Sequence, residues 1–163
     1  MDATGRIPVY RFTRGYGPDE YCMKEPEVYT ELISDSLGMH VHPELQQLLL
    51  HNKGINRIVL ISDGFVSDDT TPPKYSHVPD LHFDAEGTIA GSKMTMDQAC
   101  RNIMTHTNCG IAQAFLMASR NPARAVGLDE EIGSIEAGKR ADLVFVNDRF
   151  DVQQVMLGGE LCG

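Results

Sequence analysis

The sequence lacks an excess of positive charge, a long apolar run and closely spaced pairs of cysteine. Its net charge of −9 and its isoelectric point near 5.0 argue against nucleic acid or an anionic membrane as a partner. They are compatible with a small anionic substrate, because one arginine at contact distance outweighs a diffuse negative field. The net charge therefore disfavours nucleic acid and anionic membranes as partners but does not identify a substrate.

The other two absences bear on the compartment. No run approaches the roughly 18 consecutive apolar residues of a membrane-spanning helix, and the segment Met1–Arg6 lacks the basic and apolar regions of a signal peptide. The cysteines have no CxxC spacing, so buried free thiols are favoured over zinc ligands or disulfides. We therefore expect a cytoplasmic protein without a membrane partner.

The clearest pattern is a strand, a helix and a second strand in succession. Glu31–Asp35 is a short apolar run typical of a buried strand, and Pro43 opens a helix that extends to Asn52. Ile58–Ile61 is a continuous apolar strand, which Asp63-Gly64 terminates. Two strands joined by a helix at this spacing form a βαβ unit, so we predict that they are parallel neighbours.

The other predicted elements are a short helix at Asp19–Met23, a hairpin over Leu81–Gly91 that turns at Asp84–Gly87, helices at Thr95–Thr107 and Ile111–Ser119, and β-structure in the remainder.

Asp63 follows the carboxyl end of the second predicted strand. In barrels and open α/β sheets, reactive side chains project from that end of the strands. An aspartate there can receive a proton from a metal-bound water and return it to a leaving amine. The alternative is that Asp63 caps the turn at Gly64, which is a frequent role of Asp-Gly.

The segment His40-Val41-His42-Pro43 follows the first predicted strand. Side chains alternate along extended backbone, so His40 and His42 point to opposite sides and do not suit one shared metal ion. We expect one ring to face the pocket and hydrogen-bond a substrate, and the other to cap the helix or meet solvent. A surface histidine near a helix start is the alternative.

Residues 121–127 and 132–146 form the longest recognisable pattern: a helix stopped by glycine, a tight turn and an apolar strand. It resembles the closing segment of metal-dependent amidohydrolases, in which the chain returns from the catalytic barrel to a small β-sandwich. A closed (β/α)8 barrel usually needs about 250 residues. This chain has 163, so the resemblance implies part of an enzyme.

Four further segments narrow the resemblance: Ile33–Asp35, His40–Pro43, Ile61–Gly64 and Gly87–Met96. Their order and spacing are similar to the C-terminal half of N-acetylglucosamine-6-phosphate deacetylases. The implied reaction is metal-dependent hydrolysis of the acetamide of N-acetylglucosamine 6-phosphate to glucosamine 6-phosphate and acetate. Two departures are a Ser36–Met39 segment longer than the family spacing, and Gly64 where alanine is common.

The resemblance implies roles for the candidate residues. Asp63 would be the general base and acid, and His40 would contact the phosphorylated sugar. Thr95 and Met96 would line the pocket, largely through their backbone. Arg14 loosely matches an arginine that reaches the substrate phosphate from the neighbouring subunit, a task that suits a bidentate guanidinium.

Arg6 and Arg11 are alternatives to Arg14, and a solvated role for all three arginines is equally open. A homodimer is implied if one of them completes the neighbour's site.

The resemblance also places the metal ligands in the first half of the barrel, just before a segment that Met1–Gly5 resembles. The complete enzyme would hold a divalent metal of the zinc or iron class, whereas we expect no metal site in this chain and no activity of the chain alone. His77, His82 and His106 are predicted to lie at the surface or in packing.

The predicted fold is α/β: the C-terminal portion of a (β/α)8 TIM-type barrel with segments of a small β-sandwich. Residues 1–120 would form the partial barrel, and residues 121–163 the end of the return helix and the sandwich strands. The expected partners are a phosphorylated amino sugar and either a second copy or the missing N-terminal half. Two alternatives stay open: another amidohydrolase, such as a cyclic amidase or an N-acyl amino-acid hydrolase, and a non-catalytic fragment that needs a partner half.

Overall fold

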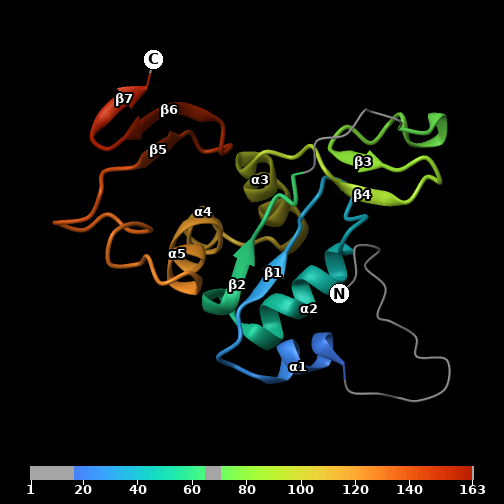
Figure 1. The fold of residues 1–163 in the computed structure, drawn as a ribbon, viewed down its shortest axis with the longest axis horizontal. Coiled ribbons are helices and arrows are strands. Elements are labelled where there is room, and N and C mark those ends of the chain that lie inside the picture. Colours follow the sequence, from blue (N-terminus) through green and yellow to red (C-terminus); the bar gives the residue numbers. More distant parts are fainter. Residues whose placement is uncertain (1–16, 65–70, 163) are drawn as a thin grey trace.

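The computed structural model describes residues 17–64 and 71–162 (Figure 1). Its helices are α1 Pro18–Lys24, α2 Pro43–Lys53, α3 Met96–Thr107, α4 Ile111–Phe115 and α5 Asn121–Ala125. Shorter turns are η1 Ile55–Arg57, η2 Pro73–Tyr75 and the π-helical η3 Leu116–Arg120. The strands are β1 Thr30–Leu32, β2 Ile58–Leu60, β3 Leu81–Phe83, β4 Ile89–Ser92, β5 Leu143–Val146, β6 Val152–Leu157 and β7 Glu160–Cys162. No helix in these ranges is long and apolar enough to cross a lipid bilayer.

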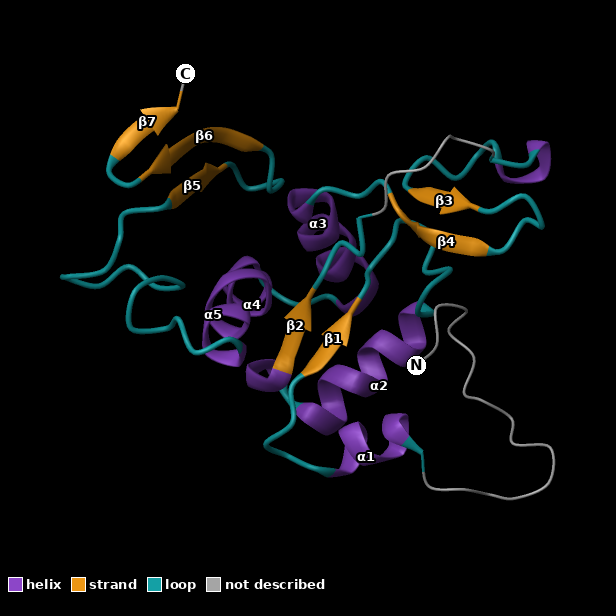
Figure 2. Cartoon of the chain, in the orientation of Figure 1, coloured by secondary structure: helices purple, strands orange, loops and turns teal. Residues whose placement is uncertain are grey.

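The predicted βαβ unit is confirmed. β1 and β2 pair in parallel, with Leu32 opposite Leu60, and α2 connects them. Figure 2 shows the two strands side by side, with α2 on one flank and α4 and α5 on the other. β1 is shorter than predicted, because Ser34 and Asp35 already belong to the loop that follows it.

The core lies between these two strands and the helices around them. Ile58 and Leu60 of β2 are buried, and they belong to one apolar cluster with Leu49 of α2 and Ile103 of α3. Burial of an aliphatic side chain contributes roughly 1.5–3 kcal/mol. The strands are thus held by helix packing, as expected for parallel strands.

The predicted helix Ile111–Ser119 and the helix end predicted within residues 121–127 form one helical stretch. The chain passes from α4 through the π-helical turn η3 into α5, without the break expected at Ser119. Pro122 has no amide hydrogen for the regular helical bond, and the wider π turn immediately before it absorbs this mismatch. The helix ends at Ala125, shortly before Gly127, as the glycine signal predicts.

The remaining strands form two antiparallel sheets. β3 and β4 make the predicted hairpin, and β5, β6 and β7 form a three-stranded sheet in that order. In Figure 1 these sheets lie on opposite sides of the β1–β2 pair. Arg140 and Asp142 form an ion pair just before β5, with 2.5 Å between Nε and Oδ2.

All four cysteines are free thiols, as predicted, although only Cys100 is buried and Cys162 is exposed. Burial raises the pKa of the Cys100 thiol to about 12. A thiol with so high a pKa is not a nucleophile at neutral pH.

Candidate active site

The carboxyl ends of β1 and β2 lie at one edge of their sheet, at the upper end of the pair in Figure 1. Leu32 and Leu60 are register partners, so the loops that leave the two strands begin side by side. His40 lies on the first loop and Asp63 on the second. The parallel topology therefore brings the two main candidates to neighbouring loops.

Asp35 organises the first of these loops. Its Oδ1 accepts hydrogen bonds from the amides of Leu37 (3.2 Å) and Met39 (2.8 Å), and its Oδ2 accepts one from the amide of His40 (2.8 Å). Burial raises the pKa of Asp35, but hydrogen bonds from His40 and Met39 outweigh burial and lower the pKa below its usual value. The carboxyl group is therefore ionised at neutral pH.

Gly38 allows the loop to turn so tightly. Its φ is +65°, and a β-carbon added there would lie 2.5 Å from Cδ of Pro43. Asp80, close to β3, holds the loop from outside through the amide and hydroxyl of Ser36, at 2.7 and 2.9 Å. The segment Ser36–Met39, which is longer than the family spacing, is thus an ordered loop held by hydrogen bonds.

His40 is buried, with 1% of its surface exposed. Its Nδ1 lies 3.2 Å from Oδ2 of Asp35, whereas its buried Nε2 has no hydrogen-bond partner within the described ranges. His42 is exposed, and its ring accepts a hydrogen bond of 3.4 Å from the amide of Glu44 at the start of α2. The prediction that one of the two histidines caps this helix is confirmed.

Asp63 has an exposed side chain and a left-handed backbone with φ of +51°. Such a conformation is uncommon for residues other than glycine and costs energy that the surroundings must supply. Its carbonyl accepts a hydrogen bond of 2.9 Å from the amide of Ser92, which also bridges to Gly64. No described residue hydrogen-bonds its carboxylate, so the side chain is available for chemistry.

Thr95 and Met96 lie where α3 begins. The amide of Thr95 donates to Oε1 of Gln98 at 2.9 Å, and Met96 packs against the main core. Ser92 connects this segment to the second loop, because its hydroxyl donates to the carbonyl of Ser62 and accepts from the amide of Met94 (3.1 Å). The start of α3 is therefore fastened to the edge that carries Asp63. Arg14, Arg6 and Arg11 lie outside the described residues.

The polar contacts that support the loops at the carboxyl ends of β1 and β2 were not predicted from the sequence. His106 of α3 lies 3.4 Å from the hydroxyl of Ser34 and 3.3 Å from Oε1 of Gln46, so it packs as predicted but in a specific network. The spacing of Asp35 five residues before His40 could have indicated their contact. The role of Asp80 had no local signal, because its partner Ser36 lies 44 residues away.

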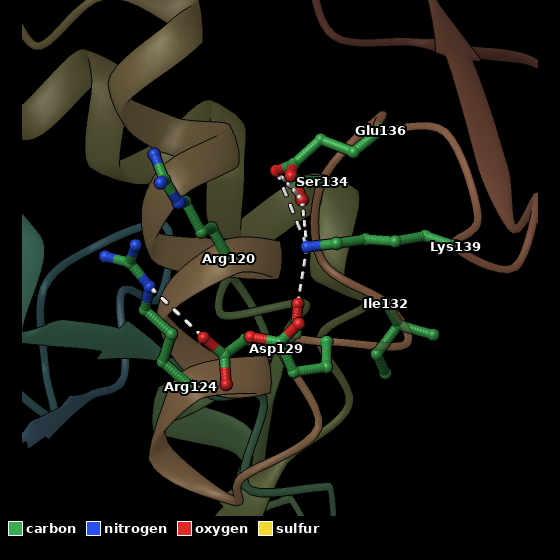
Figure 3. A pocket seen from close by; sticks show the side chains of 8 residues that line it. Arg120, Arg124, Asp129, Ile132, Ser134, Glu136 and Lys139 are labelled. Carbon is green, nitrogen blue, oxygen red and sulfur yellow. Dashed lines mark hydrogen bonds and ion pairs between the residues drawn. The ribbon is translucent and has the colours of Figure 1, made fainter.

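The closing segment surrounds a separate polar hollow of about 160 Å³ (Figure 3). Lys139 crosses it, donates to Ser134 at 2.6 Å and to the carbonyl of Asp129, and lies 3.5 Å from Glu136. Arg124 lies 3.8 Å from Asp129. These contacts hold the turn that contains Asp129, Ser134 and Glu136 against Lys139 and against Arg124 of α5.

The packing around Gly133 explains why the closing segment has glycine at this position. Its φ is +89°, and an added β-carbon would lie 2.6 Å from that of Ala123 in α5. The pattern serves packing and contributes no candidate catalytic group.

The sequence profile described as the amidohydrolase family matches residues 29–162. This span contains both loops at the carboxyl edge and the closing segment. The chain belongs to the amidohydrolase family. Membership implies a TIM-barrel-type enzyme fold.

Two relatives illustrate the similarity. The putative N-acetylgalactosamine-6-phosphate deacetylase of Escherichia coli K12 is 34% identical over 146 residues, which cover 85% of this chain and 86% of that protein. The N-acetylglucosamine-6-phosphate deacetylase of Vibrio furnissii is 32% identical over 143 residues, or 83% of this chain but 35% of that protein. The resemblance predicted from the sequence is confirmed.

Solved structures agree. N-acetylglucosamine-6-phosphate deacetylase from Thermotoga maritima aligns with a TM-score of 0.75 and 29% identity, covering 89% of this chain and 41% of that one. A mutant of the Mycobacterium smegmatis enzyme in complex with N-acetyl-D-glucosamine-6-phosphate aligns with a TM-score of 0.72 and 31% sequence identity. The alignment covers 89% of this chain and 40% of that one. The chain therefore spans about two fifths of the length of these enzymes.

Proposed function

We propose that this chain carries the proton-transfer and sugar-binding part of a metal-dependent hydrolase that removes acetate from N-acetylglucosamine 6-phosphate. The observation that carries the proposal is the placement of His40 and Asp63 on neighbouring loops, at the carboxyl edge of two parallel strands. Both residues lie inside the span that matches the amidohydrolase family. The names of the relatives, all deacetylases of hexosamine 6-phosphates, support the substrate.

Asp63 is the proposed general base and acid. Water attacks the acetamide carbonyl and gives a proton to the Asp63 carboxylate, which then returns it to the amine as the C–N bond breaks. General acid–base catalysis of this kind contributes typically 10²- to 10⁴-fold. The bond from Ser92 to the Asp63 carbonyl supports the position of the carboxylate.

The other candidates bind the sugar in this proposal. His40 meets it through Nε2, and Thr95 and Met96 face it with their backbone. Arg14 reaches the phosphate of a substrate held by a second copy, in a homodimer. Residues 1–120 belong to the barrel and residues 121–163 to the return helix and a β-sandwich, in a cytoplasmic enzyme.

A divalent metal of the zinc or iron class completes the proposal. The described residues do not fit such an ion, because no three His, Cys, Asp or Glu side chains gather within the described ranges. Catalytic zinc sites use about three protein ligands, and Asp63 offers one carboxylate. We therefore place the ligands in a segment beyond these residues and assign to this chain only the steps above.

The test combines this chain with the N-terminal segment of the V. furnissii relative, which supplies the part that the alignment does not cover. Co-elution of the two segments establishes assembly, and acetate release is then measured with N-acetylated glucosamine and galactosamine 6-phosphates. We expect release by the assembly. An assembled pair that leaves both sugars intact but hydrolyses a cyclic amide or an N-acyl amino acid would contradict the proposal.

A further inference from the structure

The two ring nitrogens of His40 have different surroundings. Nδ1 lies 3.2 Å from Oδ2 of Asp35, and Nε2 is buried without a hydrogen-bond partner among residues 17–64 and 71–162. A neutral imidazole has one N–H, and the hydrogen bond made by one nitrogen decides where that proton lies. An ionised carboxylate only accepts hydrogen bonds. The proton of His40 therefore belongs on Nδ1.

We propose that Asp35 is a positioning residue of this site: it holds His40 as the Nδ1–H tautomer, so that Nε2 presents a lone pair to a hydroxyl group of the substrate. The inference rests on the proposed function for the identity of the substrate. The pairing of Asp35 with His40 and the resulting tautomer do not depend on it.

Nε2 lacks a hydrogen-bond partner among the described residues, and a donor from outside them would satisfy it. Polar atoms inside proteins almost always have a partner, and an unpaired one calls for an explanation. A lone pair on Nε2 requires a donor. The hydroxyls of a sugar are donors, whereas the oxygens of a phosphate dianion only accept. His40 in this tautomer can thus accept a hydrogen bond from a sugar hydroxyl.

Asparagine cannot replace the carboxylate. Four donors converge on the two oxygens of Asp35: three backbone amides and Nδ1 of His40. An amide group has one oxygen, and either orientation of it points an NH₂ at N–H donors. Asp35→Asn therefore weakens the hold on the His40 ring while preserving the size of the side chain.

Asp80 provides a matched control. It is buried like Asp35 and fastens the same loop, but through Ser36 and not through the imidazole. Asp80→Asn therefore loosens the loop without removing the partner of Nδ1. A purely structural role of Asp35 would make the two variants alike.

The experiment measures the ¹⁵N shifts of the His40 ring by long-range NMR correlation in the 163-residue chain, with His40→Gln used for assignment. In the unmodified chain, with the ring in its neutral form, we expect a protonated Nδ1 and an unprotonated Nε2. Asp35→Asn should move both shifts toward a tautomer mixture, and Asp80→Asn should leave them in place. In the assembly with the N-terminal segment, Asp35→Asn should lower kcat/KM about 10- to 150-fold, as expected for a lost bond to a charged group.

An unprotonated Nδ1 in the unmodified chain overturns the inference, even if Asp35→Asn does not fold. Equal shifts in the Asp35→Asn and Asp80→Asn chains overturn it too, as does unchanged kcat/KM. If the NMR result is as expected but the assembly releases no acetate, the positioning role stands and the proposed function fails.

Discussion

The side-chain amide of Asn121 donates a hydrogen bond of 2.7 Å to the carbonyl of Ile58, the first residue of β2. The same amide donates to the carbonyl of Ile55, also at 2.7 Å, and Asn121 is completely buried. One side chain of the closing segment thus satisfies two backbone groups where the chain enters the strand that leads to Asp63.

We predict that Asn121→Ala destabilises the chain. Each carbonyl left without a donor in the interior costs about 1–3 kcal/mol. Urea unfolding should show a midpoint well below that of the unmodified chain. Asn52→Ala, on the exposed end of α2, is the control and should change the free energy of unfolding by no more than about 0.5 kcal/mol. Equal midpoints for Asn121→Ala and the unmodified chain would show that this contact is not stabilising.

Asp63→Asn should remove most of the turnover of the assembled enzyme. The amide cannot accept the proton, so kcat should fall by about 10²- to 10⁴-fold. KM should change little, because the carboxylate is not proposed to hold the sugar. Asp148→Asn, an exposed aspartate beyond β5, is the control for a lost surface charge. Near-normal kcat in Asp63→Asn would remove Asp63 from the mechanism.

The elements with strong local signals were predictable. Pro43 and Gly54 bound α2, and the apolar run at Ile58 gives a buried strand, so the βαβ unit and its parallel pairing followed from the sequence. The turn that joins the helix Ile111–Ser119 to the helix end before Gly127 did not follow, because a π turn has no simple periodic pattern.

The candidate site was predictable to a similar extent. Residues after strand ends can be read from the sequence, and this placed His40 and Asp63 at one edge. Ser92, which bonds the backbone of Asp63, and Asp80, which bonds Ser36 on the loop of His40, lie in or next to a distant hairpin. Their contacts depend on tertiary structure and could not be inferred from spacing.

The substrate phosphate should matter for catalysis if Arg14 meets it. We predict that the assembled enzyme hydrolyses N-acetylglucosamine 6-phosphate with a kcat/KM about 10- to 150-fold above that for unphosphorylated N-acetylglucosamine. The reason is that a charge-assisted pair contributes roughly 1.5–3 kcal/mol. Arg14→Ala should reduce this ratio, whereas Arg6→Ala and Arg11→Ala should not. A ratio that falls only in one of the latter two variants would transfer the role to that arginine.

Acid should destabilise the chain partly through Asp35. Hydrogen bonds keep its pKa in the folded state below the unfolded value of about 3.9. A lowered pKa stabilises the fold above the unfolded pKa, and this contribution is lost as pH falls through the folded pKa. The free energy of unfolding should therefore fall below about pH 4. Asp35→Asn should be less stable at pH 7, and the difference between the two chains should shrink in acid. A difference that stays constant from pH 7 to pH 3 would exclude this linkage.

The last prediction concerns metal and activity together. The purified chain should bind no stoichiometric divalent metal and release no acetate from an N-acetylated amino-sugar phosphate. Catalytic zinc sites need about three protein ligands and a water, whereas Asp63 provides one carboxylate and the Nδ1 of His40 is already paired with Asp35. A single carboxylate does not hold a transition metal against solvent. Elemental analysis after dialysis measures the metal, and an enzymatic acetate assay measures the reaction.

Addition of the N-terminal segment of a relative should give a complex that both binds a divalent metal and releases acetate. One metal per assembled pair, with acetate release that Asp63→Asn abolishes, is the expected result. Release from the assembly but not from either segment alone would show that the site is divided between them. One tightly bound metal per isolated chain, lost in His40→Gln or Asp63→Asn, would contradict this view, because the chain would then hold a complete metal site of its own.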